Sequence, residues 1–312
     1  MSRPAAAAAL PLLAIAAGLA SRALLGHAAP LPVALFVLVT IAATAAALFA
    51  LARGTSLAER LASPVLFGLF VLWVWEMLVL GLKVSPVLLP PPTAVAVAFG
   101  NHYRTLAADF RLTYLHSVVI GYAIGCLLGF AVAIAIDRSP FLKRGFAPFA
   151  SLMSAMPIVA IAPIMIMWFG FGWPSKAAVV VLMTFFPMLV STTAGLGEAG
   201  AMEHELMQSY AAGYWATLIK LRLPAALPLI FTALKLNSTL ALIGAVVAEF
   251  FGTPIGGMGF RISTEAARMD LGVVWATITV AALAGSISFG LIALLERAVT
   301  FWHPSFRTPA GS

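Results

Sequence analysis

The sequence predicts an all-α protein, a polytopic membrane helix bundle of about eight transmembrane helices. Of the 312 residues, 62% are hydrophobic and only 9% are charged, a composition too apolar for a soluble globule. The apolar residues gather in runs of roughly 20, the length that a helix needs to cross a bilayer core. Helices are the expected spanning elements because each one satisfies its own backbone hydrogen bonds within the lipid.

Eight apolar runs carry this prediction. They cover residues 5–25, 32–52, 64–82, 114–136, 147–169, 177–196, 227–250 and 271–295. A polar joint, RGTSLAERLAS, ends at Ser63 and separates the first two runs from the other six. We therefore divide the chain into a two-span extension at 1–62 and a six-helix core at 63–312.

The alanine-rich first run is also compatible with a secretory signal sequence. A second apolar stretch follows Arg22, however, and no convincing cleavage site lies between the two. We therefore expect a retained span. The segment KVSPVLLPPPT, which follows the third run, holds four prolines between Pro86 and Pro92 and cannot continue a helix. We expect an extended outer loop there, followed by a short amphipathic piece at 93–110.

The Lys and Arg residues of the connections predict the orientation. With a cytoplasmic N-terminus, the inner connections and the tail collect Arg53, Arg60, Arg138, Lys143, Arg144, Lys220, Arg222, Arg297 and Arg307. The opposite side holds Lys83, Arg104, Arg111, Lys176, Arg261 and Arg268, mostly in longer connections where charge constrains topology less. We therefore place both ends inside. Contacts with the inner leaflet of the lipid bilayer then explain most of the net charge of +7, and no nucleic-acid partner is needed.

Small residues recur every four positions along the fourth run. They are Ser117, Gly121, Gly125, Gly129 and Ala133, and this spacing lines them along one helix face that another backbone can approach closely. We favour packing of one span on its neighbour over a more specific role such as dimerisation.

The fifth run, SLMSAMPIVAIAPIMIMWFG, contains Pro157 and Pro163 within one apolar stretch. Each proline removes a backbone donor and clashes with the preceding turn, so the helix should bend there. Met153 and Met156 add adaptable side chains. Two interpretations stay open: these four residues line a path that opens and closes, or they belong to a kinked core helix.

Catalysis and metal binding by this chain are not expected. Cys126 is the single cysteine, and the five histidines are scattered without ligand spacing. Charges within the runs are few: Glu76 in the third, Lys235 near the inner end of the seventh and Glu249 near its outer end. The sequence shows no paired, deeply placed acid and base, although an ion-coupled transporter usually needs ionisable groups or broken helices near the midplane. For Glu76 we favour an interfacial position.

The connection at 197–226 is polar at its start, favours a helix in its middle and is basic near its end. The spacing of Leu206, Tyr210, Ala211, Tyr214 and Leu218 places apolar side chains on one side of a short helix. Such a helix fits a groove on a soluble subunit. It is equally compatible with a position on the membrane surface.

This connection resembles the EAA signature of importer-type ABC permeases. In the resemblance, Glu205 corresponds to the acidic residue that opens the signature, Ala211 to its glycine, and Leu221, Leu223 and Pro224 to its end. Leu206 and Met207 replace the two alanines of the signature, and Gly213 follows the altered glycine position closely. From Pro86 to Arg307 the chain is similar to permeases of binding-protein-dependent importers for nitrate, sulfonate, taurine and related solutes. The segments that carry this similarity are LLPPPTAV, GYAIGCLLGFAVAIAI, PFASLMSAMPIVAIAPIMIMWFGFG, LRLPAALPLIFTALKLNSTLALIGAVVAEFFG and ALLERAVTFWHPSFR.

The resemblance implies a multi-pass subunit of the bacterial inner (plasma) membrane that uses no cofactor. Its implied partners are a second permease copy in a homodimer, two cytoplasmic ATPase subunits and an outer solute-binding protein. ATP hydrolysis is expected in the ATPase subunits, because this chain has no G-x-x-x-x-G-K-[ST] phosphate loop. The solute is expected to be riboflavin or a pyrimidine-like heterocycle, or alternatively nitrate, a sulfonate or taurine. A secondary, ion-coupled transporter is the alternative function, and a membrane enzyme is a third class.

Overall fold

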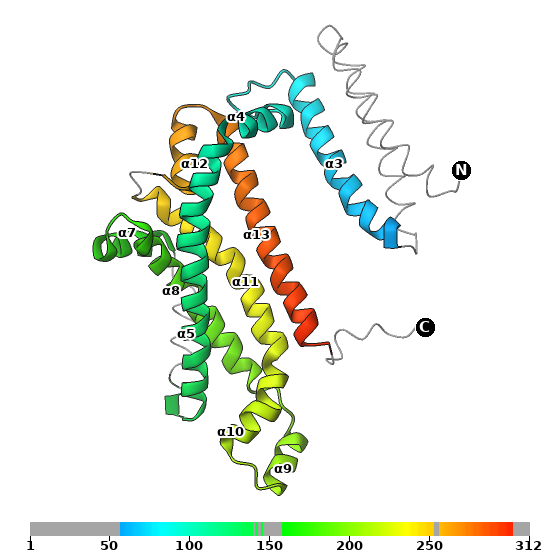
Figure 1. The fold of residues 1–312 in the computed structure, drawn as a ribbon, viewed down its shortest axis with the longest axis vertical. Coiled ribbons are helices and arrows are strands. Elements are labelled where there is room, and N and C mark those ends of the chain that lie inside the picture. Colours follow the sequence, from blue (N-terminus) through cyan, green and yellow to red (C-terminus); the bar gives the residue numbers. More distant parts are fainter. Residues whose placement is uncertain (1–56, 140, 143–144, 146–157, 253–255, 302–312) are drawn as a thin grey trace. The chain divides into compact units, whose positions relative to one another are not determined.

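The computed structural model describes residues 57–139, 141–142, 145, 158–252 and 256–301 (Figure 1). These residues form helices and the turns between them, and no strand occurs among them. Four helical segments are long and apolar enough to cross a membrane: 92–137, 173–195, 214–250 and 271–299. Two shorter apolar helical stretches, 67–81 and 160–169, accompany them. The all-helical class is thus confirmed, whereas eight transmembrane helices are not, and the first two predicted spans lie outside the described residues.

The chain divides into two compact units, and the smaller one contains residues up to Asn101 together with Glu265–Ala276. Its main helix is α3 (Leu57–Gly81), and α4 (Pro92–Phe110) begins in it after the proline-rich connection. Glu76 is buried and accepts hydrogen bonds from the backbone nitrogen and the hydroxyl of Thr93, at 3.0 and 2.7 Å. The carboxylate therefore caps the first turn of α4, where backbone donors have no partner within the helix.

The helix predicted after the prolines is present, but it does not end before the next span. α4 continues without interruption into the π-helical segment η1 (Arg111–Val119) and then into α5 (Ile120–Asp137). Neither glycine nor proline occurs between Gly100 and Gly121, so nothing in the local sequence terminates the helix. The sequence prediction placed the start of this span at residue 114 and missed the continuity.

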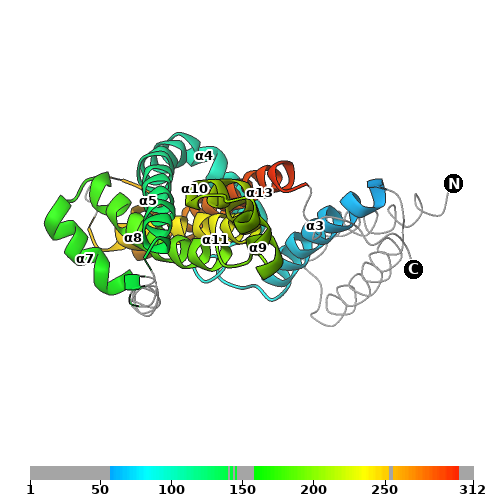
Figure 2. The same ribbon diagram turned by 90° about the horizontal axis from the view of Figure 1, so that it is seen from below.

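The larger unit contains residues 102–264 and 277 onward. Its described helices are η1, α5, α7 (Ile158–Phe169), α8 (Trp173–Gly195), a helical connection at 201–222 and α11 (Leu223–Phe250). It also contains the start of α12 (Met258–Ala267) and most of α13 (Leu271–Val299). Figures 1 and 2 show α5, α8 and α11 running next to one another.

The stripe of small residues on α5 packs against α8, as the sequence predicted. Ser117, Gly121, Gly125, Gly129 and Ala133 are all buried. A Cβ added at Gly121 would lie 2.7 Å from the carbonyl oxygen of Ala177, and one at Gly129 would lie 2.5 Å from that of Phe185. The absence of side chains on α5 therefore lets the two helix backbones approach closely.

Polar side chains tie α11 to its neighbours. Asn237 is fully buried and donates to the carbonyl oxygen of Thr184 in α8 at 2.8 Å and to Cys126 in α5 at 3.4 Å. Lys235 pairs with Glu296 of α13 at 2.7 Å. Lys235 was expected near the inner end of its span, and Glu296 lies one residue beyond the predicted run 271–295. The two residues are 61 positions apart in the sequence, so local spacing did not indicate this pair.

Candidate functional site

The connection between α8 and α11 consists of two short helices and a π-helical turn. They are α9 (Ala201–Ser209), α10 (Tyr214–Thr217) and η2 (Leu218–Arg222), and η2 runs directly into α11. We call residues 201–222 the connecting segment. Figure 1 shows α9 and α10 at one end of the larger unit and the start of α12 near the other.

Ala211 occupies a position that ordinarily belongs to glycine. Its φ is +55°, in the left-handed region. The Ala211 nitrogen donates to the carbonyl oxygen of Gln208 at 2.8 Å, and the Ala212 nitrogen donates to that of Met207 at 3.0 Å. These two bonds define a Schellman motif that ends α9, in which the residue after the helix is usually glycine. Gly213 does not substitute for the glycine of the signature, because its φ is −70° and a Cβ added to it would meet no atom within 4 Å.

Glu205 is exposed and lies in the middle of α9 rather than at its start. The acidic residue of the first turn is Glu203. The helix dipole stabilises a carboxylate within the first turn of a helix. Glu205 lies beyond that turn, so the dipole does not stabilise it. The Glu205 side chain is instead available at the surface of the connecting segment.

The predicted apolar side of a single helix is divided between two different environments. The chain turns at 210–213, so Leu206 and Tyr210 are exposed, by 56% and 76%. Leu218, in contrast, is buried in a core cluster with Tyr214 packed against it. The left-handed turn at Ala211 breaks the periodicity on which the prediction relied.

The connecting segment exposes several large apolar side chains. These are Met202, Leu206, Tyr210, Trp215 and Ile219, each more than half exposed. Between them lie Glu203, Glu205 and Gln208, whereas Lys and Arg do not occur in α9.

Leu221, Leu223 and Pro224 connect this segment to the span. All three are partly buried, and Leu223 packs on the same core cluster as Leu218. Pro224 lies in the first turn of α11, directly after the π-helical turn η2.

Arg222 fixes the end of the connecting segment to two other helices. Its two terminal nitrogens donate to the two carboxylate oxygens of Asp137, at 2.6 and 2.8 Å, and its Nε donates to the carbonyl oxygen of Leu196 at 2.9 Å. The hydroxyl of Tyr214 also donates to Asp137, at 3.1 Å. Arg138 lies over the ring of Tyr214, 5.3 Å from its centre. We call Asp137, Arg222, Tyr214 and the Leu196 carbonyl the loop anchor.

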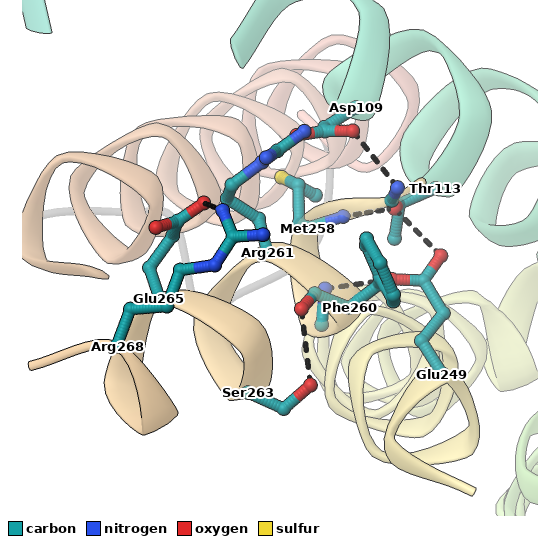
Figure 3. A network of polar contacts seen from close by, with 11 residues as sticks. Asp109, Thr113, Glu249, Met258, Phe260, Arg261, Ser263, Glu265 and Arg268 are labelled. Carbon is teal, nitrogen blue, oxygen red and sulfur yellow. Dashed lines mark hydrogen bonds and ion pairs between the residues drawn. The ribbon is translucent and has the colours of Figure 1, made fainter. Parts of the chain in front are cut away.

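A second polar network surrounds the beginning of α12 (Figure 3). The backbone nitrogens of Gly257, Met258 and Gly259 donate to Asp109, Thr113 and Glu249, at 2.9, 2.7 and 2.6 Å. Thr113 also donates to Glu249 at 2.7 Å, and Arg261 pairs with Asp109 at 2.8 Å. We call this arrangement the α12 cap. It satisfies three successive backbone donors at a helix start.

Sequence reasoning missed both networks. Asp137 and Arg222 are 85 positions apart, and Thr113 and Glu249 are 136 apart. Two features pointed toward the α12 cap: the charge of Glu249 within an apolar run, and the glycines at 256, 257 and 259. No such feature pointed toward the loop anchor. Gly257 has a φ of +126°, and a Cβ there would lie 2.5 Å from a carboxylate oxygen of Glu249.

The structure describes one of the four predicted gate residues. Pro163 lies within α7 and is exposed, whereas Met153, Met156 and Pro157 lie outside the described residues. α7, α5 and α8 line an open apolar pocket of about 480 Å³. Its lining includes Ile124, Met165, Trp168 and Val181.

Comparison with known proteins supplies the family. Residues 121–301, more than half of the chain and including both α5 and the connecting segment, match the family described as binding-protein-dependent transport system inner membrane component. The chain belongs to this family. It is therefore a transport subunit, a permease that crosses the inner membrane several times.

Individual relatives of the permease transport different solutes, according to their names. The chain is 30% identical to the formylaminopyrimidine transport permease ThiX of Halalkalibacterium halodurans, over 77% of this chain and 95% of the relative. It is 28% identical to a putative aliphatic sulfonates permease, SsuC of Bacillus subtilis, over 72% and 81%. It is also 28% identical to the riboflavin permease RibX of Chloroflexus aurantiacus, over 70% and 81%. These similarities place the permease in the branch of ABC importers that also includes the taurine permeases.

Proposed function

We propose that this permease is the transmembrane subunit of an ATP-driven importer and that an ATPase subunit docks on its connecting segment. The importer moves a small solute, delivered by an outer binding protein, into the cytoplasm. The exposed apolar side chains of α9, α10 and η2 carry this proposal, because they stand on a segment that the loop anchor fixes to the spans.

A protein partner accounts for these side chains better than the membrane surface does. A helix that lies on a membrane usually carries Lys and Arg on its polar side, because the inner leaflet is anionic. The basic residues of the connecting segment, Lys220 and Arg222, lie in η2 next to the spans, whereas α9 has Glu203 and Glu205 and no Lys or Arg. Its acidic residues would be repelled by the lipid headgroups, whereas a groove on a soluble subunit provides both apolar contact and basic partners for the carboxylates.

We propose the topology that the charge distribution predicts. The connections at 53–63, 137–146 and 197–226 and the tail after Arg297 lie in the cytoplasm. The energy comes from two separate ATPase subunits, and a second copy of the permease completes the transmembrane path as a homodimer. Closure of the ATPase subunits on ATP moves the connecting segment and switches the bundle between outward and inward openings.

The proposed solute is a small polar molecule, with a riboflavin-like or pyrimidine-like heterocycle as the first candidate and nitrate, a sulfonate or taurine as the second. The permease names cover both classes. Uptake of the two classes by cells that overproduce the complete importer distinguishes them.

An ion-coupled secondary transporter is less well supported. Among the described residues within the spans, Lys235 is paired with Glu296, Lys176 donates to the carbonyl oxygens of Phe171 and Gly252, and Glu249 accepts bonds from Thr113 and Gly259. These contacts hold helices together rather than surround a site for a coupling ion.

Co-purification in mild detergent tests the proposal. The permease is expected to retain an ATPase subunit, and Leu206→Asp is expected to release it because a charge then replaces an apolar contact. Leu88→Asp is the matched control, since Leu88 is 74% exposed in the connection before α4 and lies on the side that we place outside. Glu205→Lys is expected to weaken the association while the permease stays folded. Full retention and coupled ATP hydrolysis in Leu206→Asp and Glu205→Lys would contradict the docking site.

A further inference from the structure

The loop anchor joins three helix ends through one guanidinium group. Arg222 is the last residue of η2, Asp137 is the last residue of α5, and Leu196 directly follows α8. Asp137 has a side chain only 2% exposed and binds both terminal nitrogens of Arg222. A planar guanidinium that binds a carboxylate through two parallel bonds fixes orientation as well as distance.

Close packing surrounds these polar contacts. Gly195 lies against the backbone of Ala226, so that a Cβ on Gly195 would stand 3.1 Å from the Ala226 carbonyl oxygen. Leu196, Leu218 and Ala226 belong to one buried core cluster. The end of α8 and the start of α11 therefore contact each other directly beside the ion pair, and little free volume separates them.

We propose that Asp137 and Arg222 are positioning residues that transmit movement of the connecting segment to α5 and α8. The inference rests on the proposed function, because it assumes that an ATPase subunit moves this segment. A rotation of η2 displaces the Arg222 guanidinium, which is bonded to α5 through Asp137 and to α8 through the Leu196 carbonyl. Because Gly121, Gly125 and Gly129 hold α5 against α8, these two helices receive the displacement together.

The pair of Lys235 and Glu296 provides the matched control. It also joins two helices of the larger unit, through one bond of 2.7 Å between partly buried groups. It does not include any residue of the connecting segment. Breaking it disturbs the bundle without interrupting the connection between η2, α5 and α8.

Two reporter cysteines separate movement of the segment from movement of the span. The single native cysteine is first replaced, Cys126→Ala. Gln208→Cys then reports on α9, where Gln208 is exposed. Phe171→Cys reports on the turn before α8, at the opposite end of that helix from Leu196, where Phe171 is 61% exposed. The complex of permease and ATPase is labelled with a maleimide, with and without a non-hydrolysable ATP analogue.

The analogue is expected to change the labelling rate at both positions in the otherwise native complex. In Asp137→Asn, the analogue should still change the labelling rate at position 208. Its effect on the labelling rate at position 171 should become about tenfold smaller, within the usual range of coupling between sites. Arg222→Lys, which keeps the charge but loses the two-point contact, should behave in the same way and decides the question if Asp137→Asn does not assemble. Glu296→Gln should leave both changes intact.

An undiminished change at position 171 in Asp137→Asn and Arg222→Lys overturns the inference and leaves the proposed function standing. The inference is also overturned if Glu296→Gln abolishes the change in labelling rate at position 171 as fully as Asp137→Asn and Arg222→Lys do. The effect is then a general weakening of the helix bundle. If the native complex shows no change at position 208, the proposed function fails and the inference fails with it.

Discussion

Gly125 of α5 lies against Val181 of α8 so closely that a Cβ on the glycine would stand 2.7 Å from the Val181 carbonyl oxygen. Gly125→Ala should therefore separate the two helices and destabilise the permease by about 1–3 kcal/mol, the usual cost of overpacking. Gly290→Ala in α13 is the matched control, because nothing lies within 4 Å of the added atom. It should be neutral or stabilising, since alanine favours a helix more than glycine does. Thermal unfolding in detergent measures both, and equal effects would argue against close packing at the stripe.

Ala211→Gly should stabilise the turn after α9. The left-handed conformation of Ala211 costs an L-residue with a Cβ about 1 kcal/mol, which glycine avoids. Ala212→Gly lacks this benefit, because Ala212 does not have a positive φ, and should be neutral or destabilising. Hydrogen exchange of the amides of α9 measures the difference. Faster exchange in Ala211→Gly than in the native permease would show that the turn is not strained.

Thr113→Val should weaken the α12 cap. The substitution keeps the shape of the side chain but removes the acceptor of the Met258 N–H and the donor to Glu249. A buried donor without a partner costs about 1–3 kcal/mol. Thr113→Ser retains the hydroxyl and should lose less stability. Thermal unfolding of the two variants tests the cap, and a Val variant as stable as the Ser variant would show that these bonds contribute nothing.

Replacing Pro157 and Pro163 together by alanine tests the gate hypothesis. Pro163 lies within α7, whereas Pro157 lies outside the described residues. Alanine restores the backbone donors and removes the ring clashes, so the bend predicted for the fifth apolar run should be lost. If the bend belongs to a gate, solute uptake should slow while membrane insertion stays intact. Uptake at the native rate would leave the prolines as elements of packing.

Local patterns predicted the parts of the fold that depend on local spacing. The four-residue repeat from Ser117 to Ala133 predicted a closely packed face, and the structure places α8 against it. The charge runs and the EAA-like spacing predicted a distinct polar connection before α11, and the structure contains the helical segment 201–222 there. Such features are visible because periodicity and turn chemistry act over a few residues.

Local sequence patterns did not predict hydrogen-bond partners that are far apart in the sequence. Nothing around Arg222 indicates that its guanidinium meets Asp137, and nothing around Thr113 indicates Glu249. The same limit explains the single amphipathic helix predicted at 206–218. Its spacing is helical, but α9 ends just before Ala211, which has a left-handed conformation. An alanine in the sequence does not predict this conformation, because glycine is its usual occupant.

Labelling of Gln208→Cys by an impermeant maleimide tests whether the ATPase subunit docks on the connecting segment. In a Cys126→Ala background, we expect position 208 to be labelled in inside-out membrane vesicles stripped of the ATPase subunit, to be labelled more slowly when the subunit is added back, and not to be labelled in intact cells. Labelling from outside intact cells, or a rate unaffected by the added ATPase subunit, would show that the connecting segment is not the docking site.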